Sequence, residues 1–309
     1  MEPNVVVFGQ LARDLVLVID QVPAAGQSGR VRRRRELLGG KGANQAVALA
    51  QLGMRPALVA VAGDDQSGTR LIEQAGKDGV DTSAVIRRPG TRSGLIVDVV
   101  TPDGQWRYLA DLPQSVLLTE ADVAAAESLA ATAPWASIQL QQPSSAALAA
   151  ARQAAITGAR VVLDGAPDAD ADTEDLLALA SVVRADAREA GLLAGTEISG
   201  PDDARRAAKN ILSQGPTLVA LAVGAAGNYF AWPGGELLLP LTNTPVADTT
   251  GAGDAFTAAL IAALHADEPP ERAARLAAAA AGATVGRPGG RPALTKSALD
   301  HQLGLLPDS

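Results

Sequence analysis

The sequence predicts an α/β protein in which a doubly wound, mainly parallel sheet carries helices on both faces, accompanied by a small β-sheet. Short β-branched runs alternate with Ala- and Leu-rich helical patterns, which is typical of βαβ units. The 309 residues are 47% hydrophobic, enough to bury a large core. Two further segments show strand-like alternation without a helix between them, and they predict the small sheet. We expect residues 1–10, 39–92 and 111–309 to form the α/β core and residues 11–38 and 93–110 to form the small sheet.

Buried strands of the main sheet are expected where short apolar runs are rich in β-branched residues. These runs are Val5–Phe8, Ala57–Val61, Ala136–Leu140, Arg160–Leu163, Ser181–Val183 and Thr217–Ala222. Helical patterns lie at Asn44–Leu52, Ser67–Asp78, Ser144–Thr157, Thr173–Ala180, Asp202–Ser213 and Ala255–Leu264. Because ligands of such sheets bind at the carboxyl ends of the strands, we expect the functional site there.

The small sheet is predicted from Leu11–Leu38 and Ser93–Ala110. Within the second segment, Pro102-Asp103-Gly104 separates two alternating runs and predicts a hairpin. A small sheet with one unsupported face usually covers a site or pairs with another chain. The run Arg32–Arg35 is followed by Glu36 in an acidic protein, which favours a charged edge strand over a nucleic-acid site. A contact between one of these arginines and an anionic group of the substrate remains an alternative.

Composition excludes several classes of function. The net charge of −8 disfavours nucleic acid and membrane surfaces as partners. The absence of Cys and the presence of only two His, expected at the surface, disfavour zinc chemistry and Ser-His-Asp triads. The N-terminus lacks the features of a secretory signal, and the longest small-apolar run, Leu276–Val285, is about half a membrane span. We therefore expect a soluble, cytoplasmic protein.

The stretch Asp248-Thr249-Thr250-Gly251-Ala252-Gly253-Asp254 leads directly into a helical pattern. Small residues at 251–253 allow backbone N–H groups to converge at a helix start, where the helix dipole attracts an anion such as phosphate. Asp254 falls in the first turn beside that point, which suggests chemistry at a phosphate with Asp254 as the base. The alternative is structural: the carboxylates cap the helix and the glycines permit a tight turn.

A second glycine-rich stretch, Gly39-Gly40-Lys41-Gly42-Ala43-Asn44-Gln45-Ala46, opens another helical pattern. Small residues let a ligand approach the backbone closely, and the Asn44 amide suits vicinal hydroxyls. Lys41 offers a flexible charge for a phosphate or a hydroxyl. The structural alternative is a turn with Asn44 as N-cap. Neither G-x-x-x-x-G-K-[ST] nor G-x-G-x-x-G is present, so a phosphate site must be of another type and a nicotinamide dehydrogenase is disfavoured.

On these two stretches the chain resembles the ribokinase-like (PfkB) carbohydrate kinase family over essentially its whole length. Residues 39–63 match the first family signature, and residues 39–46 have the sequence typical of ribokinases. Residues 248–254 match the second signature completely. The resemblance implies ATP-dependent phosphorylation of a sugar hydroxymethyl group with Mg²⁺ and, in ribokinase-like members, a potassium ion. It also implies that the two small-sheet segments form a β lid that carries a homodimer contact.

The resemblance assigns roles to individual residues. Asp254 is similar to the catalytic base, and Gly251, Ala252 and Gly253 are similar to the anion hole for the γ-phosphate. The substrate-binding positions are Asp14, Gly40, Lys41, Asn44 and Gln141. The nucleotide-binding positions are Asp186, Glu189, Gly224 and Gly227. The potassium ligands would be Asp248 and the carbonyl groups of Thr250, Val285 and Gly289.

Several positions depart from the family pattern. Ala12 replaces an Asn of the lid, and Gln141 replaces a Glu that contacts ribose, which puts ribose specificity in doubt. Asp186, Ala187, Ala222 and Ala293 replace other polar groups near the phosphates and potassium. A kinase for a nucleoside or another sugar (fructose, a keto-deoxy acid, a phosphorylated sugar) therefore stays open, as does a catalytically silent sugar-binding regulator.

Overall fold

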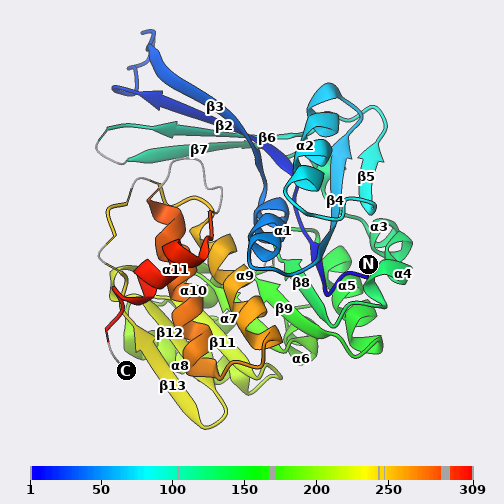
Figure 1. Cartoon of the computed structure of the whole chain (residues 1–309), viewed down its shortest axis with the longest axis vertical. Coiled ribbons are helices and arrows are strands. Elements are labelled where there is room, and N and C mark those ends of the chain that lie inside the picture. Colours follow the sequence, from blue (N-terminus) through cyan, green and yellow to red (C-terminus); the bar gives the residue numbers. More distant parts are fainter. Residues whose placement is uncertain are drawn as a thin grey trace.

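The core of the computed structural model is a nine-stranded, mainly parallel sheet, which confirms the predicted α/β class (Figure 1). The structure describes residues 2–102, 105–167, 172–242, 244–246, 248–286 and 293–307. Seven strands are parallel, and the hairpin β12–β13 adds two antiparallel strands at one edge. The strand order is β13 (Gly235–Leu239), β12 (Asn228–Trp232), β11 (Leu218–Ala222), β10 (Val182–Ala185), β9 (Arg160–Asp164), β8 (Trp135–Gln139), β1 (Val5–Phe8), β4 (Pro56–Gly63) and β5 (Val85–Arg88).

Helices cover both faces of this sheet. One apolar core joins it to α1 (Lys41–Gln51), α2 (Gln66–Lys77), α9 (Ala252–His265), α10 (Pro270–Val285) and α11 (Lys296–Leu303). The other core joins it to α3 (Glu120–Ala125), α4 (Glu127–Ala130), α5 (Ser144–Ile156), α6 (Thr173–Leu179), α7 (Ala187–Ala194) and α8 (Pro201–Leu212). Alternate residues of one strand enter opposite cores, as the pleat requires: Val5 and Val7 the first, Val6 and Phe8 the second. None of the helices in the described part of the chain is long and apolar enough to cross a membrane.

The six predicted strands and six predicted helices are present, β1 with the predicted bounds and the others with shifted ends. The largest shifts are at the starts of α1 and α9: α1 begins at Lys41 rather than Asn44, with Gly40 at the N-cap position with φ 86°, and α9 begins at Ala252 rather than Ala255. The interpretation of Asn44 as an N-cap is therefore wrong, and Asn44 lies inside the first turn. The predicted surface position of His265 and His301 is confirmed, since both are exposed.

The predicted small sheet is present as four strands, here called the lid. Its order is β3 (Val31–Gly39), β2 (Ala12–Ile19), β6 (Gly94–Val100) and β7 (Trp106–Asp111). β2 and β6 are parallel, and β6 and β7 form the predicted antiparallel pair. Of their connecting turn, residues 103 and 104 lie outside the described residues. Figure 1 shows the lid extending sideways from the core above α1 and α9.

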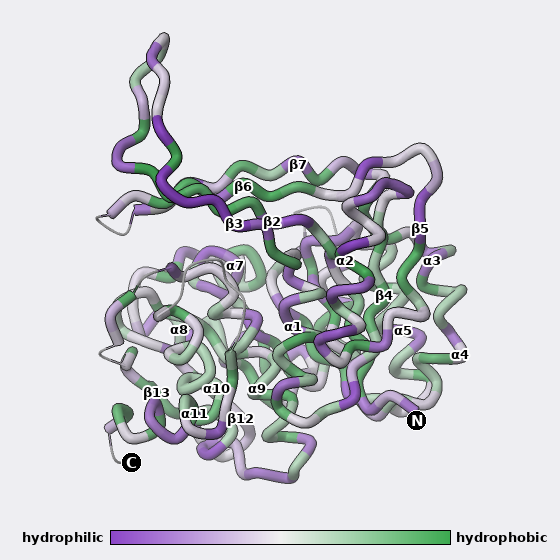
Figure 2. The backbone as a smooth tube through the Cα atoms, turned by 45° about the horizontal axis from the view of Figure 1, so that its top comes forward, coloured by the Kyte–Doolittle hydropathy of each residue, from purple (hydrophilic) through white to green (hydrophobic). Residues whose placement is uncertain are grey.

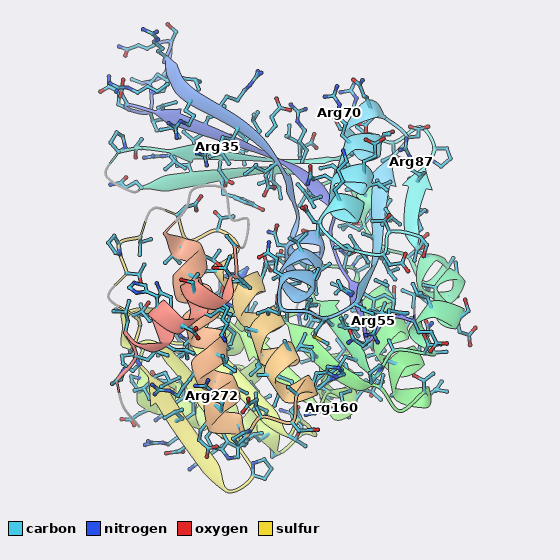
Figure 3. All side chains as sticks on the ribbon, viewed as in Figure 1. Arg35, Arg55, Arg70, Arg87, Arg160 and Arg272 are labelled. Atoms are coloured by element: carbon cyan, nitrogen blue, oxygen red, sulfur yellow. The ribbon has the colours of Figure 1, made fainter. Side chains whose placement is uncertain are left out.

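The arginine run lies on β3, an edge strand of the lid, as predicted. Arg32 pairs with Asp20, and Arg34 lies 3.7 Å from Glu36. Figure 2 shows β3 as strongly hydrophilic and β6, on the other side of β2, as more hydrophobic, and Figure 3 places Arg35 on the lid. Charged side chains on an exposed edge oppose pairing with other strands.

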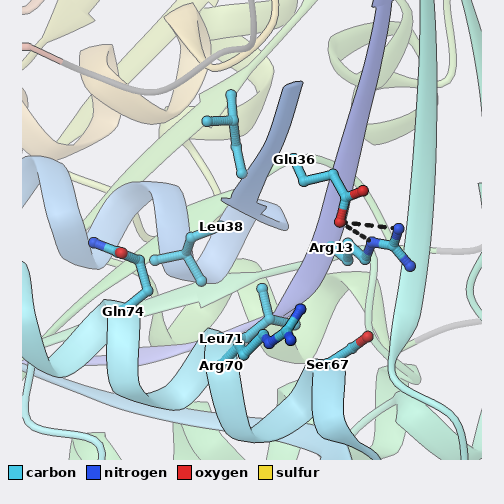
Figure 4. A pocket seen from close by; sticks show the side chains of 8 residues that line it. Arg13, Glu36, Leu38, Ser67, Arg70, Leu71 and Gln74 are labelled. Atoms are coloured by element: carbon cyan, nitrogen blue, oxygen red, sulfur yellow. Dashed lines mark hydrogen bonds and ion pairs between the residues drawn. The ribbon is translucent and has the colours of Figure 1, made fainter. Parts of the chain in front are cut away.

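A cavity of about 260 Å³ lies where the lid meets α2 (Figure 4). Its walls include Arg13 and Glu36, whose side chains are 3.0 Å apart, and Arg70 of α2. Because Arg13 and Asp14 are successive residues of one strand, their side chains point to opposite faces of the lid. This cavity is therefore on the outer face, away from Asp14.

Candidate active site

A cleft of about 470 Å³ opens between the inner face of the lid and the carboxyl ends of β1, β8 and β10. The five residues predicted to bind substrate all line it: Asp14, Gly40, Lys41, Asn44 and Gln141. Thr250, Gly251, Gly253, Asp254 and Asp186 line the same cleft. The two glycine-rich stretches therefore open onto one space, at the edge of the sheet where a site was expected.

Two helix starts bring these stretches together. Gly40 and Gly251 are the N-caps of α1 and α9, and both have positive φ, 86° and 72°, which residues other than glycine rarely adopt. The α1 and α9 helices pack against each other on the same face of the sheet. Their N-termini thus point into the cleft from adjacent positions.

Asp254 is 4% exposed, in the first turn of α9. The Asn44 amide donates to Oδ2 over 3.1 Å, and the Gln45 amide donates to Oδ1 over 3.3 Å. Burial raises the pKa of Asp254 to about 6, while Lys41 and the two amides pull it down. A carboxyl group with this pKa is ionised at neutral pH and accepts a proton more readily than an exposed aspartate.

A layer of polar side chains behind Asp254 fixes its orientation. Gln45 Oε1 accepts from Ser137 at 2.8 Å, so the Gln45 amide nitrogen must face the carboxylates. That nitrogen also donates to Asp164 at 2.8 Å, and Thr257 donates to Asp164 at 3.2 Å. The network is fully buried and continuous from β8 through α1 to α9.

Two cations, Arg184 and Lys41, line the cleft. Arg184, at the end of β10, pairs with Asp164 at 3.2 Å and approaches Glu189 at 3.9 Å. A Cβ atom added to Gly253 would lie 2.6 Å from the guanidinium, so Arg184 is packed against the α9 start. Lys41 lies 3.5 Å from Glu189. Burial lowers the pKa of Lys41, but Asp164, Glu189 and Asp254 together raise it, so the lysine stays charged.

The backbone at the α9 start offers N–H groups to the cleft. Ala252 N–H donates to Thr249 over 3.3 Å, while within the described residues the N–H groups of Gly251 and Gly253 have no backbone acceptor. Orphan N–H groups of a helix start attract anions. The predicted first-turn position of Asp254 beside them is confirmed.

At the lid end of the cleft, Asp14 is 2% exposed and its Oδ1 has no hydrogen-bond partner among the described residues. Gly39 lies so close that a Cβ there would overlap the Asp14 carboxyl group. Burial, and then the charges of Asp98, Asp254 and Asp248, raise the pKa of Asp14 to about 8.

Asp98 of β6 was not predicted from the sequence. It is 1% exposed, and neither carboxylate oxygen has a hydrogen-bond partner in the described part of the chain. Burial, reinforced by Asp248, raises its pKa to about 6. Tyr108 of β7 is paired directly opposite Asp98 and lines the cleft. Burial and the charges of Asp14, Asp98 and Asp254 raise the pKa of Tyr108, so its hydroxyl stays neutral.

The predicted nucleotide-binding residues lie at the carboxyl ends of β10 and β11. Asp186 caps α7 and forms a reciprocal box with Glu189, each side chain accepting from the other's backbone N–H at 2.8 Å. Gly224 and Gly227 lie in the turn between β11 and β12, with φ 54° and 110°. Because β10 and β11 are parallel neighbours, this turn and Asp186 lie at the same edge of the sheet.

The predicted potassium ligands are partly described. Asp248 N–H donates to the Val285 carbonyl at 3.1 Å, and Asp248 Oδ1 accepts from Thr250 N–H at 2.9 Å, so three of the four positions are adjacent. Gly289 lies outside the described residues. Within the described ranges there is no group of three or more His, Asp or Glu side chains arranged to hold a metal ion.

Gln141 reaches the cleft within a cluster of glutamines. Gln139 Nε2 donates to Gln141 Oε1 at 3.3 Å, and Gln10 N–H donates to Gln139 Oε1 at 2.9 Å. Ala12 is fully buried in β2.

Sequence reasoning missed Gln45, Asp164, Arg184, Asp98 and Tyr108. Asp164 and Arg184 directly follow two predicted strands, so the rule that placed the site at carboxyl ends could have found them. Gln45 was inside the quoted motif. Asp98 and Tyr108 carried no motif, and only the pairing register brings them together.

Comparison with known proteins agrees with this architecture. The model of the family described as "pfkB family carbohydrate kinase" matches residues 2–297. The chain is 31% identical over 296 residues to an ATP-dependent ribose-1-phosphate kinase of Halopiger xanaduensis, covering 94% of this chain and 95% of that protein. It is 29% identical over 265 residues to a bifunctional ribokinase/ribose-5-phosphate isomerase A of Fructilactobacillus sanfranciscensis, covering 85% of this chain but only 49% of that protein.

Among solved structures, the ribokinase of Arabidopsis thaliana complexed with ribose and ATP superposes with a TM-score of 0.82 at 25% identity, covering 98% of this chain and 99% of that one. The family match spans nearly the whole chain, and the fold agrees over the same range. The chain therefore belongs to the pfkB family of carbohydrate kinases.

Proposed function

We propose that this enzyme transfers the γ-phosphoryl group of ATP to a hydroxymethyl group of a sugar or a sugar-containing acceptor, with Asp254 as the general base. The observation that carries the proposal is the position of the Asp254 carboxylate, buried between the two glycine-rich helix starts in one cleft. The acceptor would lie between Asp254 and the lid, and the phosphates of ATP between Asp254 and Arg184.

The chemical step is an in-line displacement. Asp254 takes the proton of the acceptor hydroxyl as its oxygen forms a bond to the γ-phosphorus. The bond from that phosphorus to the β,γ-bridging oxygen breaks, and ADP leaves with the bond's electron pair. Because the transferred group has largely dissociative character, most of the catalysis is positioning and charge stabilisation, to which a placed base adds about 10²–10⁴-fold.

Charge on the transferred phosphoryl would be held by the α9 start and by two cations. The N–H groups of Gly251 and Gly253, with Ala252 between them, form the anion hole. Arg184 is packed against Gly253 and is anchored by Asp164, so it would lie beside the same oxygens. Lys41, which like Arg184 lies within 4 Å of Glu189, would contact either a phosphate or the acceptor.

Mg²⁺, when bound with ATP, would neutralise phosphate oxygens. Magnesium in such sites keeps much of its water shell and needs few protein carboxylates, so the Asp186 and Glu189 carboxylates fit it. Asp186 lines the cleft, and its cap on α7 fixes its direction. The Glu189 carboxylate is buried and lies close to both Lys41 and Arg184, so it would act on Mg²⁺ indirectly rather than as a direct ligand.

A potassium ion beside the anion hole is also part of the proposal. Carboxylate and carbonyl oxygens, the donors offered by Asp248, Thr250 and Val285, suit such a cation. Comparing turnover in potassium, sodium and tetramethylammonium buffers at equal ionic strength tests this. Equal rates in all three would rule out a potassium requirement.

In this proposal the acceptor is a sugar or contains one, and an activity screen over candidate acceptors would identify it. The relatives include a ribokinase and a ribose-1-phosphate kinase by name, and Gln141 replaces the Glu expected at a ribose contact. ADP release should be measured across ribose, ribose 1-phosphate, fructose, keto-deoxy acids and nucleosides. Thermal stabilisation by one of these without ADP release would indicate a silent binding protein instead.

The base assignment is tested by Asp254→Asn. We expect turnover to fall about 10²–10⁴-fold with the acceptor KM little changed. Asp175→Asn, an exposed carboxylate paired with Arg152 on the surface, is the matched control and should keep full activity. Near-wild-type turnover of a folded Asp254→Asn protein would show that the base is another group.

We also propose that two copies pair through their lids. The lid extends from the core, and its β7 strand exposes Leu109 (63%). Exposed apolar area on a small sheet favours association. Sedimentation analysis of wild type and Leu109→Glu tests this: the wild type should be a dimer and the variant should dissociate more readily. A monomeric wild type would contradict it.

A further inference from the structure

We propose that Asp98, acting beside Asp14, binds a nitrogen-borne hydrogen-bond donor in the distal part of the acceptor. The enzyme would then select acceptors that carry an amino group over their hydroxy, oxo or anionic counterparts. This inference rests on the proposed kinase function and specifies its substrate class.

The lid's inner face places Asp98 one step beyond Asp14. On β6, Gly94, Ile96, Asp98 and Val100 are buried and alternate with half-buried residues, so they share the inner face. The β2–β6 register pairs Asp14 with Ile96 and Val16 with Asp98. Ile96 lines the cleft, so Asp98 follows next along the same surface towards the lid tip. An acceptor whose hydroxymethyl group lies at Asp254 and whose ring lies at Asp14 would extend towards Asp98.

The number of carboxylate oxygens without a hydrogen-bond donor favours a ligand with an amino group over one with a hydroxyl group. Asp14 Oδ1, Asp98 Oδ1 and Asp98 Oδ2 are buried, and none has a partner among the described residues. Carboxylates buried without donors are costly, so such a surface implies a ligand that supplies several donors. A hydroxyl donates one proton, whereas an amino group or ammonium donates two or three and can satisfy both oxygens of Asp98.

Charge gives the same preference. Three carboxylates interact at the lid end of the cleft: Asp98 and Asp248 both act on Asp14, and Asp248 acts on Asp98, while Asp254 acts on Asp14 from the α9 start. Apart from burial, the groups that shift the pKa of Asp14 and Asp98 are all acidic. The cations Lys41 and Arg184 pair with Glu189 and Asp164 and also act on Asp254, at the other end of the cleft. An anionic substituent near Asp98 is therefore repelled, and a cation is attracted.

Tyr108 supplies a flat surface next to this position. It is directly opposite Asp98 in the β6–β7 pair, and 45% of the residue is exposed. A planar amino-substituted ring can lie on the phenol while its N–H groups reach Asp98. Two sources share the chemistry: the aminated base of a nucleoside and an amino sugar. The experiment separates them.

The test compares matched acceptor pairs that differ at one amino group. Cytidine against uridine forms the nucleoside arm, and glucosamine against glucose forms the sugar arm. kcat/KM is measured for wild type, Asp98→Asn and Asp98→Val. We expect wild type to favour the amino member of one pair by about 10- to 100-fold, as a site built for a donor rejects an analogue lacking it. The ratio should approach one in both variants, while kcat/KM for the other member changes less than about threefold.

Thermal unfolding separates recognition from a structural role. Asp98→Asn should raise the Tm of the unliganded protein at pH 8, because it removes a buried, unpartnered charge. It should also abolish the extra stabilisation that wild type gains from the amino member. Asp111→Asn, which changes an exposed carboxylate at the end of β7 opposite Leu95, is the control and should change neither quantity.

Failure of this inference and failure of the proposed kinase function would give different results. Turnover without preference in either pair, or a preference that survives Asp98→Asn, overturns this inference and leaves the kinase function standing. Absence of ADP formation with every acceptor, combined with stabilisation by an amino acceptor that requires Asp98, refutes the kinase function and supports the site.

Discussion

The Asn44 side-chain amide lies 3.1 Å from the Asp254 carboxylate, although 210 positions separate the two residues in the sequence. One comes from the first glycine-rich stretch and the other from the second. The hydrogen bond lowers the pKa of Asp254 against the effect of burial, which is the larger of the two. In the proposed mechanism, substrate recognition and proton transfer are therefore coupled, because Asn44, the proposed acceptor contact, also holds the proposed base.

The pH dependence of catalysis should follow Asp254. With a pKa of about 6, the base is protonated and inactive below that pH, so kcat/KM should rise through pH 6 and level off above about 7. Gln45→Met removes a donor to the carboxylate, and we expect the rising limb to move to higher pH by about one unit. Gln74→Met on α2 is the control. An unshifted limb would show that Gln45 does not tune the base.

The unliganded protein should lose stability as the pH rises. The folded pKa values of Asp14, about 8, and Asp98 and Asp254, about 6, exceed the ordinary value of 3.8. Each contribution is fully present below the unfolded pKa and is lost as pH rises through the folded one. We expect Tm to fall between pH 5 and 9, and Asp14→Asn to flatten the fall by a few degrees per pH unit. Parallel curves for wild type and variant would contradict this origin.

A double variant can separate the phosphate-binding role proposed for Arg184 from its structural role as the partner of Asp164. Arg184→Met leaves the fully buried Asp164 without its cation and should cost about 3–5 kcal/mol of unfolding free energy. The double variant Asp164→Asn/Arg184→Met should recover most of that loss. If Arg184 holds the transferred phosphoryl, kcat stays low in the double variant. Recovery of both stability and kcat would limit Arg184 to a structural role.

Gly39→Ala should act on the acceptor through Asp14. The added methyl overlaps the Asp14 carboxyl group, so the side chain must move. We expect the acceptor KM to rise at least about tenfold with the ATP KM unchanged, because only the lid end of the cleft is disturbed. Gly76→Ala on α2 is the control, because a methyl group added there meets open space and the backbone conformation is helical. Equal changes in both KM values would indicate a wider distortion.

The sequence predicted the main sheet because its strands are buried on both faces and read as continuous apolar runs. It predicted the residues of the cleft because its two glycine-rich motifs each start a helix, and helix starts at the carboxyl ends of parallel strands are where ligands bind. It did not predict the hairpin β12–β13, whose mixed polar and apolar residues lack a strong period. Nor did it predict Asp98, since an isolated aspartate in an apolar strand is informative only once its face and its missing partners are known. Asp164 and Arg184 are different cases, because each directly follows a predicted strand and the expectation of a site at the carboxyl ends of the strands could have identified them.

The packing of α1 against α9 has a consequence for biosynthesis. Asn44 leaves the ribosome 210 positions ahead of Asp254, so the first glycine-rich turn has no counterpart until the second has been synthesised. A product truncated before α9 would retain the first turn and most of the sheet yet lack Asp254, the proposed base. Premature termination should therefore yield inert fragments rather than an unregulated ATPase.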